Sequence, residues 1–167
     1  GLGEATVAAP GGFFRDYFGT DQYQRDANLI LAAYPKNVAI AEGSIDPGTG
    51  AVNPGYEDTV IRDCPGGVCS YYKYLQGTSL AAPHATGVAA LIISRLGVAD
   101  ARHAGGVTMA PALVEQILRG TAQDTPCPTP RTVDYTVIGR SPEYAATCEG
   151  TEDFNSFYGD GIIDALR

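Results

Sequence analysis

The longest apolar run of the chain covers residues 80–93 and contains no Asp, Glu, Lys or Arg. His84 and Thr86 are its polar residues, and alanine and glycine recur through it, so neighbouring backbone can approach closely. A helix that is apolar all round belongs in the middle of a large core. The run is shorter than the roughly 20 residues that cross a bilayer. The pattern therefore predicts a central buried helix, and we expect no transmembrane segment.

Shorter patterns precede this run. Residues 4–8 are β-prone and are halted by the turn signal Ala-Pro-Gly-Gly at 9–12. Residues 28–34 predict a buried strand that ends at Pro35, although a short helix fits the same pattern. Residues 59–62 and 70–74 flank a tight turn and predict an antiparallel hairpin.

Other patterns follow it. Gly97 is a helix C-cap signal, and residues 98–107 predict a loop. A second helix is expected to begin at Pro111 and end at Gly120, with an apolar face formed by Leu113, Val114, Ile117 and Leu118. Residues 121–149 hold four prolines and two cysteines, which predicts an irregular segment held together by a disulfide.

The four cysteines allow three pairings. We favour Cys64 with Cys69 and Cys127 with Cys148, because residues 64–69 form a tight turn whose ends lie close together. Neither pair has C-x-x-C spacing and neither has a histidine close in sequence, so we expect no zinc site and no other metal site. Two disulfides indicate an oxidising compartment and hence a secreted, extracellular or periplasmic protein. Free buried thiols in a cytosolic protein are the alternative.

A length of 167 residues allows one domain with its own core. The net charge of −8 argues against nucleic acid and anionic membranes as partners. The sequence begins at Gly1, without an initiator Met or a signal-like apolar segment, so we expect a processed product or a fragment.

Candidate chemistry lies where the apolar run begins. Ser79 is expected at or beside the helix N-cap, where the first N–H groups lack partners and the helix dipole is positive. A nucleophile there can hold an oxyanion with its own backbone N–H. Pro83 has no N–H and crowds the carbonyl of Ser79, so we expect a distorted first turn. An ordinary serine N-cap gives the same local pattern.

The stretch Gly-Thr-Ser-Leu-Ala-Ala-Pro-His at 77–84 closely resembles the serine motif of the subtilisin-like serine proteases. Leu80 replaces the usual Met, a swap of similar volume. Two further stretches are similar to landmarks of that family, the strand ending in Ala-Pro-Gly at 7–11 and the closing signature at 157–166.

The resemblance implies an α/β fold, the C-terminal portion of the subtilisin-like fold. It comprises a parallel sheet with a central buried helix that carries the serine, and a β-hairpin insertion. Residues 1–167 would be the C-terminal part of the catalytic domain. Within it, residues 12–76 would be a long insertion between the Ala-Pro-Gly strand and the serine motif, and 121–149 the disulfide-stapled segment.

The resemblance also implies an activity, serine endopeptidase cleavage of polypeptides through an acyl-enzyme. Ser79 would be the nucleophile and, through its N–H, an oxyanion donor, and Thr78 would support it. Tyr74, Leu75 and Gln76 would contact the leaving-group side of the substrate. Packing of the tyrosines across the hairpin explains their positions equally well.

The family's Asp, His and oxyanion Asn would precede Gly1 in chain order. His84 matches the family's helix histidine, for which we expect a structural role in the core, and His103 is expected to be solvated. Without a base, Ser79 is a poor nucleophile. We therefore expect the chain alone to be inactive, with the missing N-terminal half of the catalytic domain as its partner. Calcium is common in the family, but no acidic cluster in this sequence has a spacing that indicates a set of calcium ligands.

Two other functions are alternatives. The chain could be a catalytically inert peptide-binding or structural module on this scaffold. An α/β-hydrolase is disfavoured, because its Gly-x-Ser-x-Gly turn would need glycine where Ala81 stands. His103 would be the late histidine of such an enzyme.

Overall fold

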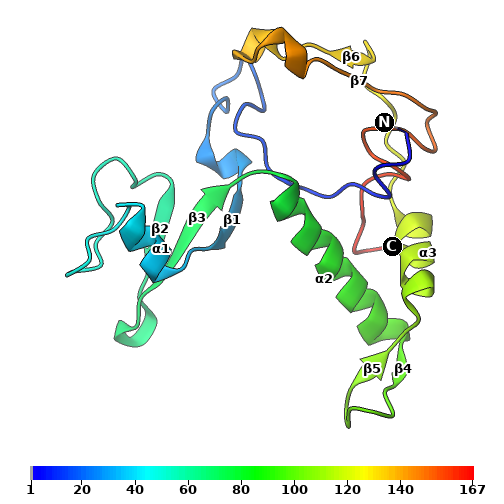
Figure 1. Ribbon diagram of the computed structural model, residues 1–167, viewed down its shortest axis with the longest axis horizontal. Coiled ribbons are helices and arrows are strands. Elements are labelled where there is room, and N and C mark those ends of the chain that lie inside the picture. The colour runs from blue at the N-terminus through cyan, green and yellow to red at the C-terminus, as the bar shows by residue number, and fades with distance from the viewer. Residues whose placement is uncertain (1) are drawn as a thin grey trace. The chain divides into compact units, whose positions relative to one another are not determined.

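The computed structural model describes residues 2–167 and divides into two compact units (Figure 1). One unit comprises residues 11–80. The other comprises the residues up to Pro10 together with 81–167. Each contains helices and strands, so the chain is of mixed α/β class.

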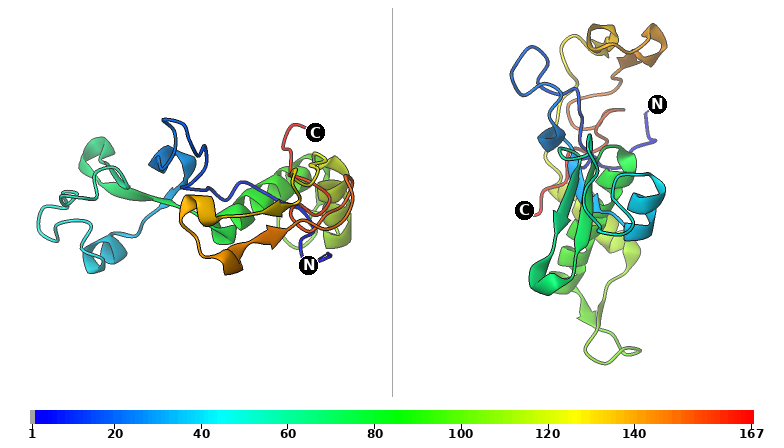
Figure 2. Two further views of the ribbon diagram at one scale, coloured as in Figure 1. Left: turned by 90° about the horizontal axis from the view of Figure 1, so that it is seen from above. Right: turned by 90° about the vertical axis from the view of Figure 1, so that its left-hand side faces the viewer.

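The unit 11–80 is built on a three-stranded antiparallel sheet with the order β1-β3-β2, which Figure 1 labels and Figure 2 shows from two further sides. Its strands are β1 (Ile30–Ala33), β2 (Val60–Asp63) and β3 (Ser70–Leu75). A 3-10 turn at Pro65–Gly67 joins β2 to β3, and the Cys64–Cys69 disulfide closes it. The predicted hairpin is confirmed, and residues 30–33 adopt the strand rather than the helix alternative.

A small core covers one face of this sheet. Its buried residues are Tyr34, Ala39, Ile45, Val60 and Tyr71. They come from the strands, from the short helix α1 (Lys36–Ala41) and from the loop that follows it. The Tyr71 hydroxyl donates to the carbonyl of Gly50 over 2.8 Å, so the ring packs in the core while its polar tip is satisfied.

A polar network borders this core. The Tyr34 hydroxyl lies 2.8 Å from the hydroxyl of buried Ser44 and donates to Glu42 over 2.6 Å. Lys73 reaches the same Glu42 oxygen at 2.6 Å and lies 4.8 Å from the centre of the Tyr34 ring. The network joins β3 to the residues that follow α1.

The other unit contains most of α2 (Thr78–Leu96) and all of α3 (Pro111–Thr121). The stretch 98–107, predicted as a loop, forms a hairpin of the two-residue strands β4 (Val98–Ala99) and β5 (Val107–Thr108). The second helix begins at Pro111 as predicted and buries Val114 from its apolar face.

Residues 121–149 are largely irregular. They contain the short pair β6 (Thr132–Val133) and β7 (Ala146–Thr147), 3-10 turns at Thr136–Ile138 and Pro142–Tyr144, and the Cys127–Cys148 disulfide. Both disulfides therefore have the expected partners.

The closing signature pairs with the start of the chain. The N–H of Ala8 donates to the carbonyl of Gly161 over 2.8 Å, and the N–H of Ile163 donates to the carbonyl of Ala8 over 2.9 Å. Ile162 pairs on its other side with Gln123. Two of the three landmarks that the sequence singled out therefore lie side by side.

The expected parallel sheet is not found. In the described part of the chain the named sheets are antiparallel, and the pairing of Ala8 with Ile162 is an isolated parallel bridge. Parallel neighbours need a crossover of a dozen or more residues, whereas the link from β2 to β3 is a tight turn that favours antiparallel pairing.

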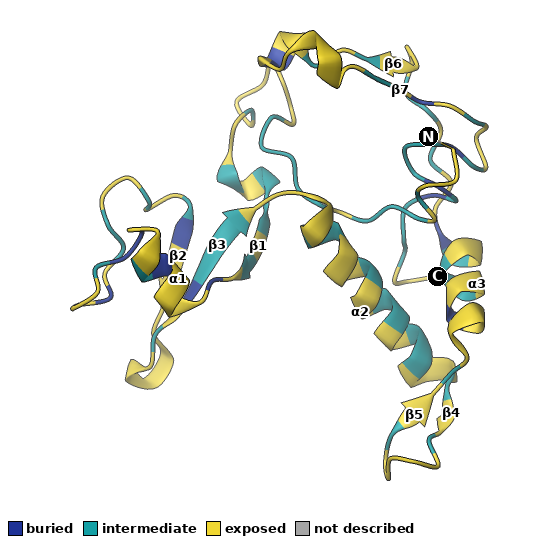
Figure 3. Ribbon diagram, in the orientation of Figure 1, coloured by how far each residue is buried: buried dark blue, intermediate teal, exposed yellow. Residues whose placement is uncertain are grey.

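The prediction that α2 is buried is wrong for the described residues. None of its residues is buried, and Leu91 has 58% of its surface exposed (Figure 3). A half-buried stripe follows the helical period, and the other residues of the helix are exposed. The stripe consists of Leu80, Ala81, Ala85, Val88, Ala89, Ile92 and Ile93.

By length and composition alone, α2 is long and apolar enough to cross a membrane, and it is the one helix in residues 2–167 that is. It has 19 residues, and an 18-residue stretch of it has a mean hydropathy of 1.2. The core helix of a soluble protein passes the same test, so the expectation of no transmembrane segment stays a prediction.

Candidate active site

Ser79 is the second residue of α2 and is exposed. Gly77 precedes the helix with φ of +136°, and its carbonyl accepts the N–H of Leu80 over 3.0 Å. The helix entry thus falls at Gly77, and Ser79 lies beside it in the first turn. The N–H of Ser79 belongs to the first turn, where N–H groups have no partner within the helix and the dipole is positive.

Pro83 lies inside α2, which runs without interruption to Leu96. The expected distortion of the first turn therefore does not break the helix. Because Pro83 has no N–H, the carbonyl of Ser79 lacks the helical donor it would otherwise have.

The residues before Ser79 are attached to the segment that begins at Gly11. The N–H of Gly77 donates to the carbonyl of Gly11 over 2.8 Å. The N–H of Phe14 donates to Oε1 of the Gln76 side chain over 2.7 Å. The sequence pattern gave no sign of these contacts, because residues far apart in the chain make them.

The predicted substrate residues end the central strand β3. Tyr74 lies opposite Leu31 and Leu75 opposite Ile30 in the pairing with β1. The N–H of Tyr74 donates to the carbonyl of Thr59 over 3.0 Å. Because β3 has a neighbour on each side, a substrate contact by these residues would have to come mainly from their side chains.

Neither histidine of the chain belongs to the compact unit that contains Ser79. His84 is five residues further along α2, roughly 140° around its axis from Ser79 at 3.6 residues per turn. It is exposed, so the expectation that it packs in a core is wrong for the described residues. Its face of α2 lines an open, mainly apolar hollow together with Pro83, Gly87, Val88 and Leu91.

His103 lies in the loop between β4 and β5, with its side chain 77% exposed as expected. Its Nδ1 lies 2.7 Å from Oδ2 of Asp100. This hydrogen bond, together with the backbone N–H of Arg102, lowers the pKa of Asp100. The hairpin follows α2 in the chain, in the unit that does not contain Ser79. An Asp–His pair therefore exists, but it belongs to the other unit.

In residues 2–167, no three or more His, Cys, Asp or Glu side chains converge as metal ligands would. The Asp46 carboxylate faces its own loop and accepts the N–H of Gly48 and both the N–H and the hydroxyl of Thr49. These hydrogen bonds lower the pKa of Asp46.

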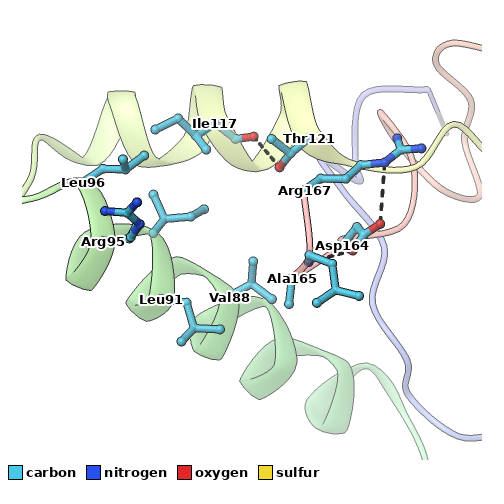
Figure 4. A pocket seen from close by; sticks show the side chains of 11 residues that line it. Val88, Leu91, Arg95, Leu96, Ile117, Thr121, Asp164, Ala165 and Arg167 are labelled. Carbon is cyan, nitrogen blue, oxygen red and sulfur yellow. Dashed lines mark hydrogen bonds and ion pairs between the residues drawn. The ribbon is translucent and has the colours of Figure 1, made fainter.

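A cavity of about 330 Å³ lies between α2, α3 and the last residues of the chain (Figure 4). Val88, Leu91 and Ile117 line it with apolar surface, and Asp164 and Arg167 form an ion pair of 3.6 Å at its edge. Ser79 is not among its lining residues, so this cavity is not the site of the candidate nucleophile.

Comparison with known proteins identifies the family. Residues 19–161 match the Subtilase family. The matched range covers the serine motif and most of the closing signature, but it begins after the Ala-Pro-Gly stretch. No curated protein and no solved structure gives a match. A match over most of the chain, with Ser79 in the first turn of α2, leads to one conclusion. The chain belongs to the subtilase family.

Proposed function

We propose that this chain is the C-terminal part of the catalytic domain of an exported subtilisin-like serine endopeptidase, with Ser79 as the nucleophile. The observation that carries the proposal is the place of Ser79 within a family match over 19–161. It lies directly after a glycine turn, at the positive end of a long helix.

In the proposed reaction the Oγ of Ser79 attacks the carbonyl carbon of the scissile peptide bond, and its proton passes to a base. The C–N bond then breaks, the amine leaves with that proton, and water hydrolyses the acyl ester. The N–H of Ser79 stabilises the oxyanion, and Thr78 supports the turn. Tyr74 and Leu75 contribute side chains to the leaving-group side of the cleft.

We propose that the base and its orienting carboxylate come from polypeptide outside residues 1–167, since His84 and His103 both belong to the unit that does not contain Ser79. The exposed surface of α2 supports such a partner, because residues 80–93 carry no charge and none is buried. An apolar surface of this kind is typical of a docking site. We propose that the N-terminal half of the catalytic domain covers it and supplies Asp, His and the oxyanion Asn.

The two disulfides support export to an oxidising compartment. We propose no metal or other cofactor for the reaction. Polypeptide is the proposed substrate, and the acidic net charge supports neither nucleic acid nor membrane as a partner.

The test is covalent labelling by a fluorophosphonate, which reports an activated serine. The chain is incubated with the probe alone and after addition of the polypeptide that precedes it in the full-length protein. We expect labelling only in the second case, at Ser79 by peptide mapping, and none in Ser79→Ala. An intact complex that remains unlabelled would refute the proposal.

The second candidate is a catalytically inert peptide-binding module. The absence of a histidine from the unit 11–80, which contains Ser79, favours it. It predicts that the chain binds peptides as it stands, with equal affinity in Ser79→Ala, and that no complement makes Ser79 reactive.

A further inference from the structure

We propose that Gln76 is a positioning residue for Ser79, acting through the hydrogen bond that its Oε1 accepts from the N–H of Phe14. This inference rests on the proposed function and gives Gln76 a different role from the substrate contact expected from the sequence.

Two hydrogen bonds attach the turn before Ser79 to one short segment. Gly77 donates to the carbonyl of Gly11 over 2.8 Å, and Gln76 accepts from Phe14 over 2.7 Å. One bond uses the backbone of the turn and the other uses the side chain of the preceding residue. Together they hold two consecutive residues of the turn against the same partner.

That partner is itself held in place. The N–H of Phe13 donates to the carbonyl of Asn28 over 3.0 Å, directly before β1. Gly12 packs so closely that a Cβ there would lie 3.0 Å from Cα of Leu29 and 3.2 Å from the carbonyl oxygen of Leu75. The segment 11–14 is therefore fixed to the sheet, and it can transmit that rigidity to residues 76 and 77.

The turn needs an external restraint because its backbone is permissive. Gly77 has φ of +136°, a conformation that glycine adopts easily and can also leave easily. A rotation there would redirect both the N–H and the Oγ of Ser79, which follow within two residues. A displacement of about 1 Å at a reacting group can cost roughly a hundredfold in rate.

Only the acceptor atom of Gln76 is needed for this role. Gln76→Glu keeps an oxygen at the same reach, so it should preserve the restraint. Gln76→Ala removes the acceptor, and Gln76→Asn shortens the side chain by one methylene. These predictions differ from those of a substrate contact, which a change of charge at this position would disturb.

The experiment combines two measurements on the unmodified chain, the three Gln76 variants and Gln116→Ala, an exposed glutamine of α3 that serves as a matched control. Amide hydrogen exchange of Phe14 and Gly77 is followed by NMR on the chain itself. The rate of Ser79 labelling by a small fluorophosphonate is followed after complementation, together with KM and kcat on a peptide.

We expect exchange at Phe14 and Gly77 to accelerate at least about tenfold in Gln76→Ala and Gln76→Asn. We also expect labelling and kcat to fall about tenfold to a hundredfold, with KM little changed. Gln76→Glu and Gln116→Ala should match the unmodified protein. A small probe does not occupy peptide subsites, so slower labelling reports the serine itself.

Unchanged exchange at Gly77 in Gln76→Ala would overturn the inference. So would a rise in KM alone, or a Gln76→Glu variant as impaired as Gln76→Ala. If the unmodified complex is not labelled although exchange responds as expected, the proposed function fails while the restraint on the turn stands.

Discussion

The backbone N–H of Gly77 donates to the carbonyl oxygen of Gly11 over 2.8 Å, which joins the first residue of the serine motif to the end of Ala-Pro-Gly. The family match begins only at residue 19, after this second landmark. The hydrogen bond nevertheless places Gly11, the last residue of this landmark, in contact with the residue that precedes α2.

Replacement of Gly12 by Ala should destabilise the unit 11–80. The residue has φ of +73°, and its Cβ would meet Leu29 and Leu75 at 3.0–3.2 Å. We expect a loss of about 1–3 kcal/mol in the free energy of unfolding, measured by urea denaturation.

Gly19→Ala is the control for Gly12→Ala, because Gly19 has φ of +83° but open space around its Cβ position. It should cost only the backbone strain of a left-handed alanine, about 1 kcal/mol. Equal losses of unfolding free energy in the two variants would show that the close packing at Gly12 does not contribute to stability.

The sequence predicted those elements whose signals are local. The turn at 64–69 specified both the hairpin and its disulfide, because a tight turn and two β-prone flanks act over a few residues. Pro111 likewise marked the start of α3 correctly.

Local sequence patterns cannot predict contacts between residues that are far apart in the chain. The pairing of Ala8 with Gly161 and Ile163 and the attachment of Gln76 to Phe14 depend on the folded chain. The exposure of α2 was also missed. A run without charges indicates that a helix can be buried, but it does not indicate which element covers the helix. The helix α1 was missed because six residues give too short a period to detect.

Asn155 should contribute strongly to stability. It is 1% exposed, its Nδ2 donates to the carbonyl of Thr125 over 2.8 Å, and its Oδ1 accepts the N–H groups of Phe157 and Tyr158. Asn155→Ala leaves these groups without partners, so we expect a loss of about 2–3 kcal/mol in the free energy of unfolding.

Asn155→Asp distinguishes the contribution of the Asn155 side chain as a hydrogen-bond donor from its contribution as an acceptor. It keeps the acceptor but replaces the donor with an oxygen that repels the carbonyl of Thr125. We expect a loss in calorimetric Tm at neutral pH that partly recovers on acidification, because the protonated acid can donate again. A neutral-pH Tm like that of the unmodified protein would contradict the role of the donor.

The Cys127–Cys148 disulfide should stabilise the chain more than Cys64–Cys69, because it closes the longer loop, with sequence separations of 21 and 5. Loop-closure entropy gives about 3 kcal/mol for the longer loop and about 2 kcal/mol for the shorter. The paired serine variants, compared by denaturant unfolding, measure the two contributions. The opposite ranking would contradict the prediction.

Glu42 should make the unit 11–80 sensitive to acid. Hydrogen bonds from Lys73 and then Tyr34 lower the pKa of its carboxyl below 4.5. The folded state therefore favours the carboxylate more than the unfolded state does. The resulting stability is fully present above about pH 4.5 and is lost as the pH falls through the lowered folded pKa.

The measurement is the urea midpoint as a function of pH in the unmodified chain and in Glu42→Gln. Glu42→Gln should be less stable at neutral pH, and its urea midpoint should fall less steeply as the pH is lowered below about 4.5. Glu152→Gln, at an exposed position, is the control and should leave the curve unchanged. Parallel acid limbs in all three proteins would exclude a contribution from Glu42.

The Asp100–His103 pair should have no part in the chemistry of Ser79, because it lies in an exposed hairpin of the other unit. We expect His103→Ala and Asp100→Asn to leave the rate of Ser79 labelling in the complemented protein within about twofold. A large loss in His103→Ala would revive the α/β-hydrolase alternative.

The hydrogen bond between Gly11 and Gly77 means that the polypeptide leaves the serine region and returns to it at one point. The polypeptide between these two glycines is thus a loop whose two ends lie together, and Gly12, Phe14 and Gln76 at its base hold them there. We expect insertions far from this base to be tolerated, because lengthening a loop adds little to its closure entropy.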